Sequence, residues 1–272
     1  MSATAALADA ARRLAAVSDT PRLDAELLLA HALGVERETL LLGLRDAAVP
    51  EGFAVLVARR LAHEPVAYII GRRAFWTIEL AVGPGVLIPR PDSETLIEAA
   101  VRHFGKVGPR AVLDLGTGSG ALLLAALAEW PQATGLGVDA SPAAVAIARG
   151  NAGRLGLAGR ATIREGGWEA ASAGTFDLVL CNPPYIADAE PLPADVVEYE
   201  PASALFAGAD GLDDYRAIAP LLRLPTGGIA CFEIGASQAA AVSTLFGEHD
   251  LLTQVAHDLA GRDRCVIVAP KT

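Results

Sequence analysis

Residues 114–120 read Asp114-Leu115-Gly116-Thr117-Gly118-Ser119-Gly120. They separate an apolar run at 111–115 from an alanine- and leucine-rich run at 121–130. The glycines let the backbone turn tightly and let a ligand approach the peptide planes. A turn of this kind between a buried strand and a helix binds ligands at the helix N-terminus. With Ala121 the string also fits the dinucleotide pattern G-x-G-x-x-(G/A), so alone it does not identify the ligand.

The chain after residue 110 alternates between strand-like and helix-like runs. Such alternation predicts an α/β fold, with a mostly parallel sheet and helices on both faces. The last two strands are joined only by residues 258–263, too few for a parallel crossover, so we expect them to pair antiparallel. The predicted strands are 111–115, 134–138, 161–164, 176–181, 228–234, 251–256 and 265–268, and the predicted helices are 92–104, 121–130 and 142–155.

The N-terminal part of the chain has a different pattern. Alternation over 75–80 and again over 86–88, broken by Gly83-Pro84-Gly85, predicts a β-hairpin. Apolar spacing predicts short helices before it, at 9–17, 21–33, 37–42 and 53–63, with Thr20 as an N-cap before Pro21. We therefore expect a helical domain at 1–70, a hairpin linker at 71–90 and an α/β domain at 91–272. The helical domain is either a substrate-docking module or a packing cap.

Composition excludes several classes of protein. The chain has 272 residues, 52% of them hydrophobic, and a net charge of −10 that lies entirely within residues 91–272. That acidic half is a poor platform for a nucleic-acid backbone. Three separated cysteines and five histidines without ligand spacing predict neither a disulfide framework nor a metal site. The longest apolar run, 121–128, is too short for a membrane span, and residues 1–11 lack a secretory signal. We expect a cytoplasmic protein that binds no membrane and no nucleic acid, with nothing that requires more than a monomer.

Asp139 follows the second predicted strand, about 20 positions after the glycines. An acid at this place accepts hydrogen bonds from both ribose hydroxyls, which favours an adenosine-containing ligand. The alternative is an acid that stabilises a helix N-terminus. Ser141 and Pro142 already supply a cap and a first-turn proline, which weakens that alternative. Asp139 does not separate a nicotinamide dinucleotide from S-adenosylmethionine.

Asn182-Pro183-Pro184-Tyr185 follows the fourth predicted strand and does separate them. The two prolines fix the backbone and remove two amide donors. Two acceptors remain, the Asn182 side-chain oxygen and the Pro183 carbonyl. A rigid pair of acceptors suits a planar NH₂ group, and the Tyr185 ring can stack on its flat face. Hydride transfer has no use for this arrangement, so we favour methyl transfer to nitrogen over a plain proline turn.

Together these motifs resemble the class I S-adenosylmethionine-dependent methyltransferases that act on an amide or amino nitrogen. Further motifs are similar to the PrmC/HemK family, which methylates N5 of the glutamine in the Gly-Gly-Gln loop of class-1 peptide chain release factors. The resemblance runs from about residue 20 to the end. It implies a Rossmann-like seven-stranded sheet with an antiparallel last strand. The further motifs are residues 64–71, Phe75-Trp76, 87–91, 210–213 and 258–264.

The resemblance also implies a role for individual residues. Gly116, Thr117, Gly118, Ser119 and Gly120 would hold the methionine part of S-adenosylmethionine, which leaves as S-adenosylhomocysteine. Asp139 would hold the ribose and Trp168 would lie beside the adenine. Asn182, Pro183, Pro184 and Tyr185 would hold the glutamine amide, with Asn182 also counted among the cofactor-binding residues. The helical N-terminal region would help to dock the release factor.

Two departures from the family pattern limit this assignment. Asp92 stands where the family often has glutamate, so it is given no role, and Gly167 replaces a polar residue before Trp168. Arg90 is either a site residue or part of an ion pair. A glutamine methyltransferase of a ribosomal protein, a DNA adenine-N6 methyltransferase and a non-catalytic binding module remain as alternatives. The acidic half opposes the DNA enzyme, and the intact 182–185 motif opposes the binding module.

Overall fold

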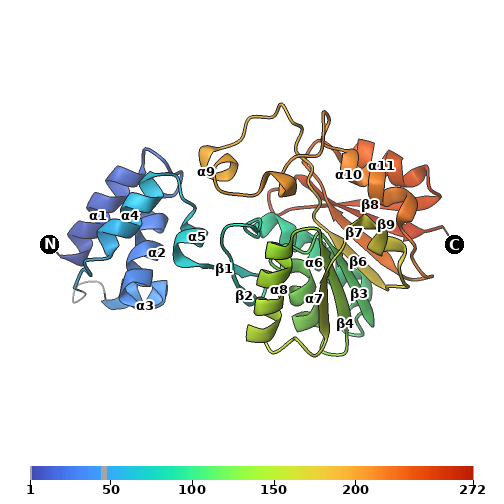
Figure 1. Ribbon diagram of the computed structural model, residues 1–272, viewed down its shortest axis with the longest axis horizontal. Coiled ribbons are helices and arrows are strands. Elements are labelled where there is room, and N and C mark those ends of the chain that lie inside the picture. Colours follow the sequence, from blue (N-terminus) through green and yellow to red (C-terminus); the bar gives the residue numbers. More distant parts are fainter. Residues whose placement is uncertain (1, 44–47, 272) are drawn as a thin grey trace. The chain divides into compact units, whose positions relative to one another are not determined.

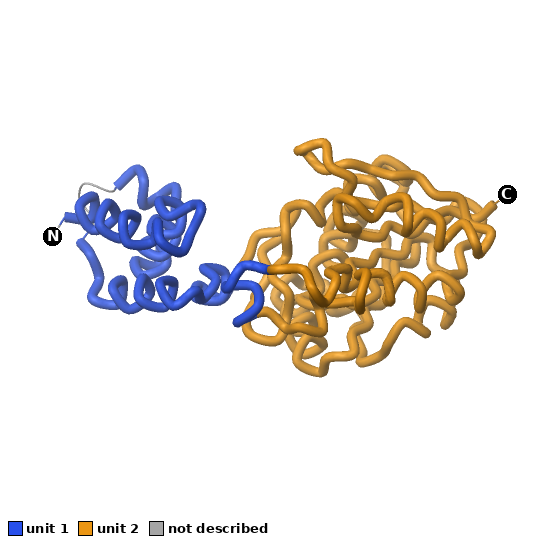
Figure 2. The backbone as a smooth tube through the Cα atoms, turned by 90° about the horizontal axis from the view of Figure 1, so that it is seen from above, with its two compact units in different colours: residues 1–72, 192–199 blue, residues 73–191, 200–272 orange. Residues whose placement is uncertain are grey.

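The structure is a computed structural model that describes residues 2–43 and 48–271. Its contacts divide the chain into two compact units (Figure 2). One unit contains residues 1–72 and 192–199, and the other contains residues 73–191 and 200–272. The hairpin therefore belongs almost entirely to the second unit, and a short segment from the middle of the α/β sequence belongs to the first. Within the described residues, no helix is both long and apolar enough to cross a membrane.

The first unit is a small helical bundle. Leucine and alanine side chains of its first two helices pack with Phe53 and Val57 in a common core. Buried Arg60 donates to Asp24 Oδ2 at 2.9 Å and to the Val17 carbonyl at 3.0 Å, so the charge is paired inside the bundle. Its helices are α1 (Ala3–Leu14), α2 (Pro21–Leu33), α3 (Arg37–Gly43), α4 (Phe53–Leu61), α5 (Val66–Ile70) and α9 (Ala194–Val197).

The second unit contains a seven-stranded sheet (Figure 1) in the order β5-β4-β3-β6-β7-β9-β8. The first five strands in this order pair in parallel, and β9 pairs antiparallel with both β7 and β8. The predicted mostly parallel sheet with an antiparallel last strand is confirmed. The strands are β3 (Ala111–Leu115), β4 (Thr134–Asp139), β5 (Ala161–Glu165), β6 (Leu178–Cys181), β7 (Ile229–Glu233), β8 (Leu251–His257) and β9 (Asp263–Pro270).

Helices cover both faces of this sheet. On one face α6 (Glu94–Phe104), α7 (Ala121–Glu129) and α8 (Pro142–Arg154) pack against the strands. On the other face lie α10 (Asp213–Ile218), α11 (Ala239–Gly247) and the 3₁₀ turns η2 (Trp168–Ser172) and η4 (Ala219–Leu221). Two further 3₁₀ turns are η1 (Pro91–Ser93) and η3 (Ala202–Ala204). The core between the layers is apolar, with Leu113, Phe232 and Phe246 fully buried.

Several element boundaries differ from the sequence prediction. Ser2 caps α1 by accepting from the Ala5 amide at 3.3 Å, so the helix begins at Ala3 rather than at residue 9 and ends at Leu14. Thr20 makes no side-chain cap bond, because its hydroxyl donates to Asp24 instead. Helix α5 was not predicted. Ser141 caps α8 as predicted, accepting from the Ala144 amide at 3.3 Å.

The hairpin forms, but its predicted turn was wrong. Its strands are β1 (Arg72–Phe75) and β2 (Ile78–Ala81), so the chain turns at Trp76 rather than at Gly83-Pro84-Gly85. Trp76 has φ +53°, a costly conformation for a bulky residue. Two long-range bonds stabilise it: Glu94 accepts from the Trp76 amide at 2.8 Å, and Glu129 accepts from its indole at 3.0 Å.

Packing of β4 against α7 gives a test of this fold. A Cβ on Gly135 would lie 2.4 Å from Leu123 Cδ1 in the buried layer. We expect Gly135→Ala to lower the free energy of unfolding by about 1–3 kcal/mol through overpacking. In a urea titration, the matched control Gly150→Ala should instead gain about 0.5–1 kcal/mol, because Gly150 is exposed within α8 with open space around it. Equal effects of the two substitutions would contradict the packing.

Candidate functional site

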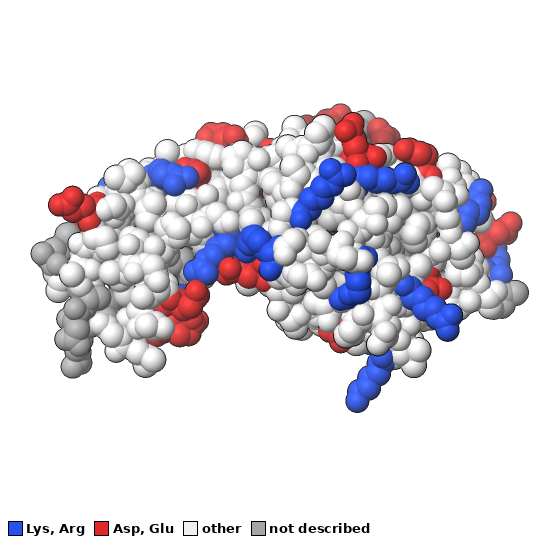
Figure 3. Space-filling model, turned by 60° about the horizontal axis from the view of Figure 1, so that its bottom comes forward, with Lys and Arg blue, Asp and Glu red and all other residues white. Residues whose placement is uncertain are grey.

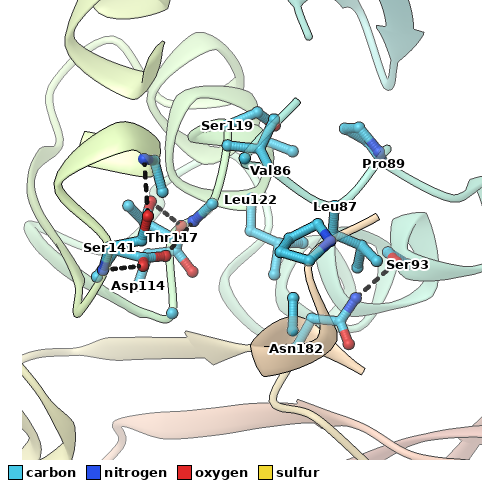
Figure 4. A pocket seen from close by; sticks show the side chains of 18 of the residues that line it. Val86, Leu87, Pro89, Ser93, Asp114, Thr117, Ser119, Leu122, Ser141 and Asn182 are labelled. Carbon is cyan, nitrogen blue, oxygen red and sulfur yellow. Dashed lines mark hydrogen bonds between the residues drawn. The ribbon is translucent and has the colours of Figure 1, made fainter. Parts of the chain in front are cut away.

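Three loops leave the sheet at the same edge. Leu115 at the end of β3 pairs with Val138 of β4 and with Cys181 of β6. Since all three strands run in parallel, the glycine loop, Asp139 and Asn182 emerge side by side. They line one cavity together with Gly85, Val86, Leu87 and Pro89 (Figure 4).

Two backbone amides of the glycine loop hold it against the end of β4. The Thr117 amide donates to the Val138 carbonyl at 2.9 Å, and the Gly118 amide donates to Asp139 Oδ2 at 2.8 Å. Gly116 has φ +67° and Gly118 has φ +54°, conformations that favour glycine. A Cβ on Gly118 would meet nothing within 3.9 Å, so the loop leaves open space above it.

Asp139 is held in place by two backbone amides. Its Oδ2 accepts from Gly118, and its Oδ1 accepts from Ser141 at 2.8 Å. A carboxylate oxygen can accept two hydrogen bonds. Each oxygen of Asp139 therefore keeps one acceptor position, which suits a pair of adjacent hydroxyl groups on a ribose.

Asp114 is the second carboxyl of the cavity wall, and it is 1% exposed. Its Oδ2 accepts from the Thr117 hydroxyl at 2.6 Å and from the Leu123 amide at 3.2 Å, whereas its Oδ1 is buried without a hydrogen-bond partner. Burial raises the pKa of Asp114 to about 7, and the charge of Asp139 adds to the rise. A cation in the cavity would favour the charged form of this carboxyl.

The charge of the lining selects the class of ligand. Among the described residues around the cavity there are two carboxyl groups, and no lysine, arginine or histidine. The sulfonium and ammonium groups of S-adenosylmethionine would find two acids there, whereas a dinucleotide pyrophosphate would have only the loop amides and the N-terminus of α7. The part of the chain that the structure describes contains no cluster of three or more His, Cys, Asp or Glu side chains able to hold a metal.

The loop 182–185 is fixed by three side-chain contacts. Asn182 Nδ2 donates to Ser93 Oγ at 3.3 Å, which leaves the amide oxygen free to accept (Figure 4). The Tyr185 hydroxyl donates to Glu233 Oε1 at 3.2 Å, and Gln238 Nε2 donates to the Tyr185 carbonyl at 2.9 Å. Burial raises the pKa of Tyr185, so its hydroxyl keeps its proton.

Gly211 explains one of the motifs outside the site. It has φ +71°, and a Cβ added to it would lie 2.3 Å from the Tyr185 carbonyl oxygen. The segment 210–213 therefore needs glycine at this position, because the backbone of the 182–185 loop packs directly on it.

Comparisons with known proteins agree with this geometry. The PrmC N-terminal domain family matches residues 5–71, and the methyltransferase small domain family matches residues 92–199. A release factor glutamine methyltransferase of Rhodospirillum rubrum is 45% identical over 258 residues, covering 92% of this chain and 79% of its own. One of Cereibacter sphaeroides is 45% identical over 276 residues, covering 98% of both chains.

The chain belongs to the release factor glutamine methyltransferase family. A solved structure, a methyltransferase from Pyrococcus furiosus, has the same fold at 17% identity. Its TM-score is 0.52, and the match covers 78% of this chain and 95% of that one. The predicted class I methyltransferase fold is thus confirmed, along with the family resemblance.

The structure brings together about half of the residues predicted for the site of this methyltransferase. Those that line the cavity are Gly116, Thr117, Gly118, Ser119, Asp139 and Asn182. Gly120 lies at the N-cap of α7, where a Cβ would come 2.9 Å from Leu124 Cδ1. Pro183, Pro184 and Tyr185 continue the loop beyond the lining residues.

Trp168 lies behind the glycine loop. A Cβ on Gly116 would come 3.3 Å from its ring, and its indole donates to Asp214 Oδ1 at 2.9 Å. Its ring also packs against the apolar core. Glu169 occupies the space that a side chain at Gly167 would need, and it accepts from the Gly167 amide at 3.0 Å.

Sequence reasoning missed the opposite wall of the cavity. Val86, Leu87 and Ser93 line it, although the 87–91 motif was noted without a role. Buried Glu200 holds this segment: it accepts from the Ile88 amide at 3.0 Å and pairs with Arg90. Arg90 is therefore part of an ion pair, and its partner follows 110 residues later in the chain.

Asp92, which the sequence analysis gives no role, and the nearby Glu94 also have structural partners. Asp92 pairs with Arg264 at 3.3 Å, and Glu94 holds the hairpin turn at Trp76. Buried Asn151 joins the hairpin to the glycine loop, because its Nδ2 donates to the carbonyls of Ala81 and Ser119. Its signal in the sequence is only a polar residue within an alanine-rich helix.

The raised pKa of Asp114 predicts that the affinity for S-adenosylmethionine depends on pH. A cationic ligand favours the charged carboxylate, so binding must release the proton that Asp114 carries below about pH 7. We expect calorimetry to show about tenfold tighter binding at pH 8 than at pH 6. Asp114→Asn should remove this dependence.

Asp250→Asn is the matched control, because Asp250 is exposed and pairs with Lys271 outside the cavity. It should keep the wild-type pH dependence. A wild-type affinity that is flat between pH 6 and pH 8 would count against the role of Asp114.

Proposed function

We propose that this methyltransferase transfers the methyl group of S-adenosylmethionine to N5 of a glutamine side chain in a peptide chain release factor. The target is the glutamine of the Gly-Gly-Gln motif in class-1 factors. The observation that carries the proposal is the free Asn182 oxygen beside an acidic cavity, in a chain whose relatives at about 45% identity are release factor glutamine methyltransferases.

The cavity residues divide the work of holding the cofactor. Gly116, Thr117, Gly118 and Ser119 hold its methionine part and Asp139 holds its ribose. Gly120 at the N-cap of α7 and Trp168 on the adenine side support the glycine loop from outside the cavity lining. Asp114 and Asp139 together balance its positive charge. When bound, S-adenosylmethionine supplies an electrophilic methyl group on a sulfonium sulfur.

The chain's own residues position the acceptor. An amide nitrogen is a poor nucleophile, because its lone pair is delocalised into the carbonyl. The Asn182 side-chain oxygen and the Pro183 carbonyl each accept one hydrogen of the glutamine NH₂, which aims the nitrogen at the methyl group, and Tyr185 covers its flat face. Holding the two reactants in the correct orientation lowers the activation barrier by about 7–11 kcal/mol. These bonds strengthen as positive charge develops on nitrogen, so they favour the transition state.

The reaction needs no dedicated general base. The carbon–sulfur bond breaks as the carbon–nitrogen bond forms, and S-adenosylhomocysteine leaves. The methylated amide then carries an extra, very acidic proton, which passes to water.

We propose that the helical residues 1–70 dock the release factor, and that the enzyme works as a monomer without binding nucleic acid. On the face shown in Figure 3, Lys and Arg side chains are interspersed with Asp and Glu and form no basic stripe.

The substrate can be tested by transfer of radiolabel from S-adenosylmethionine to a purified release factor. Label is expected on the wild-type factor and not on a factor with Gly-Gly-Ala in place of Gly-Gly-Gln. Ribosomal protein and duplex DNA serve as the competing acceptors. Label on either of these, with none on the release factor, would overturn the proposal.

Asn182→Ala tests the acceptor pair. We expect at least about a 10²-fold loss of kcat, as for loss of one transition-state hydrogen-bonding group. Affinity for S-adenosylmethionine should stay close to that of the wild type, because the glycine loop and Asp139 are intact. A turnover equal to that of the wild type would contradict the assigned role of Asn182.

A further inference from the structure

A carboxyl group lies directly behind the loop that holds the acceptor. Cys181 at the end of β6 pairs with Phe232 of β7, so the next residues along the two parallel strands are Asn182 and Glu233. Glu233 is 1% exposed and lies between Phe232 and Ile234, two members of an apolar core cluster. Burying an acid there is costly unless its oxygens meet donors.

Only one of the two Glu233 carboxyl oxygens has a hydrogen-bond partner in the described chain. Oε1 accepts from the Tyr185 hydroxyl, whereas Oε2 is buried without a partner. Burial raises the pKa of Glu233 to about 7, and the neighbouring Ser93 hydroxyl and Arg264 guanidinium oppose the rise. Ser93 thus lies beside Glu233 and also accepts from Asn182.

These contacts hold the two ends of the acceptor loop against two neighbouring buried groups, Ser93 and Glu233. Asn182, the first residue of the loop, bonds to Ser93, and Tyr185, the last residue, bonds to Glu233. The Asn182 amide can present its oxygen to a substrate NH₂ only if the Asn182 NH₂ group points away from the substrate. Ser93 Oγ accepts a hydrogen bond from that NH₂ group and so holds this orientation. The Tyr185 ring can cover the substrate amide only if its hydroxyl is held, and Glu233 holds it.

Resting on the proposed function, we propose that Glu233 and Ser93 are positioning residues that orient Asn182 and Tyr185 for transfer to the glutamine nitrogen. A carboxylate can only accept hydrogen bonds, so it attracts the Ser93 proton and leaves the Ser93 lone pairs to Asn182. An amide at position 233 could place an NH₂ donor toward Ser93. That donor would compete with Asn182 for the Ser93 oxygen.

Glu233→Gln and Ser93→Ala test this inference with single-turnover and steady-state kinetics on a release factor. We expect each to lower kcat by about tenfold. Glu233→Gln should also leave the affinity for S-adenosylmethionine within about twofold of wild type, because Glu233 lies outside the cavity lining. The double variant should lose little more than either single one, because the two residues act on the same loop. Glu233→Gln should not lower the melting temperature, since it removes a buried charge without changing the side-chain shape.

Tyr215→Phe is the matched control. The Tyr215 hydroxyl donates to the backbone carbonyl of the same Glu233 at 2.6 Å, but no hydrogen bond joins it to Asn182 or Tyr185. Its loss should lower the melting temperature and leave kcat unchanged. A pattern in which kcat merely follows stability across all variants would show a structural role and overturn the inference.

A second readout does not depend on the substrate. Crystal structures of wild type and Glu233→Gln should differ in the Asn182 side-chain torsion and in the Asn182–Ser93 hydrogen bond. If both are unchanged, the inference fails even where the release factor proves not to be the substrate. If the wild type labels no release factor, the proposed function fails. If the wild type labels it and both single variants match its kcat, only the positioning inference fails.

Discussion

The parallel register of β3 with β4 and β6 is the constraint on which the site depends. Because Leu115 is level with both Val138 and Cys181, three loops far apart in sequence leave the sheet at one edge. Each loop brings a different group: closely approachable backbone from the glycines, a carboxylate from Asp139 and an amide oxygen from Asn182. A slip of one residue between two strands would turn the neighbouring side chains to the other face. The hydrophobic layers on both faces of the sheet therefore also hold the chemical groups in place.

The electrostatics of the cavity follow from where this edge is buried. Asp114 cannot avoid the interior, because it lies within β3, so its desolvation is part of the cost of the fold. Its Oδ1 is buried without a hydrogen-bond partner, and a cationic ligand in the cavity that Asp114 lines would offset part of this cost. Glu233, also buried, has a permanent donor in Tyr185 instead. Two buried acids in one unit thus differ in their surroundings, since Asp114 lines the cavity and Glu233 holds one of the protein's own loops.

The parts of the structure that sequence could predict are those that depend on neighbours in the chain. The glycine loop, Asp139, the Ser141 cap and the alternation of strands and helices are local patterns, and each lies where it was expected. Trp76 shows the limit, because its turn is stabilised by Glu94 and Glu129, which come 18 and 53 residues later. The alternation of residue types over 75–80 alone predicts a strand that continues through Trp76.

The opposite wall of the cavity could not be predicted for the same reason. Ser93 follows the 87–91 motif, but only the fold brings it to Asn182. Glu233, which lies behind the loop and outside the cavity lining, belongs to a strand with no chemical signature.

One segment links the acceptor loop to both units. After Tyr185 the chain is closed on itself by a bridge between Ile186 and Phe206, and residues 192–199 between them belong to the helical unit. There Asp195 pairs with Arg60 at 3.4 Å, and Tyr199 donates to the Ala62 carbonyl at 2.6 Å. The next residue, Glu200, holds the 87–91 wall of the cavity. One continuous piece of chain therefore begins at the acceptor loop, contributes residues 192–199 to the helical unit and returns to the cavity wall at Glu200.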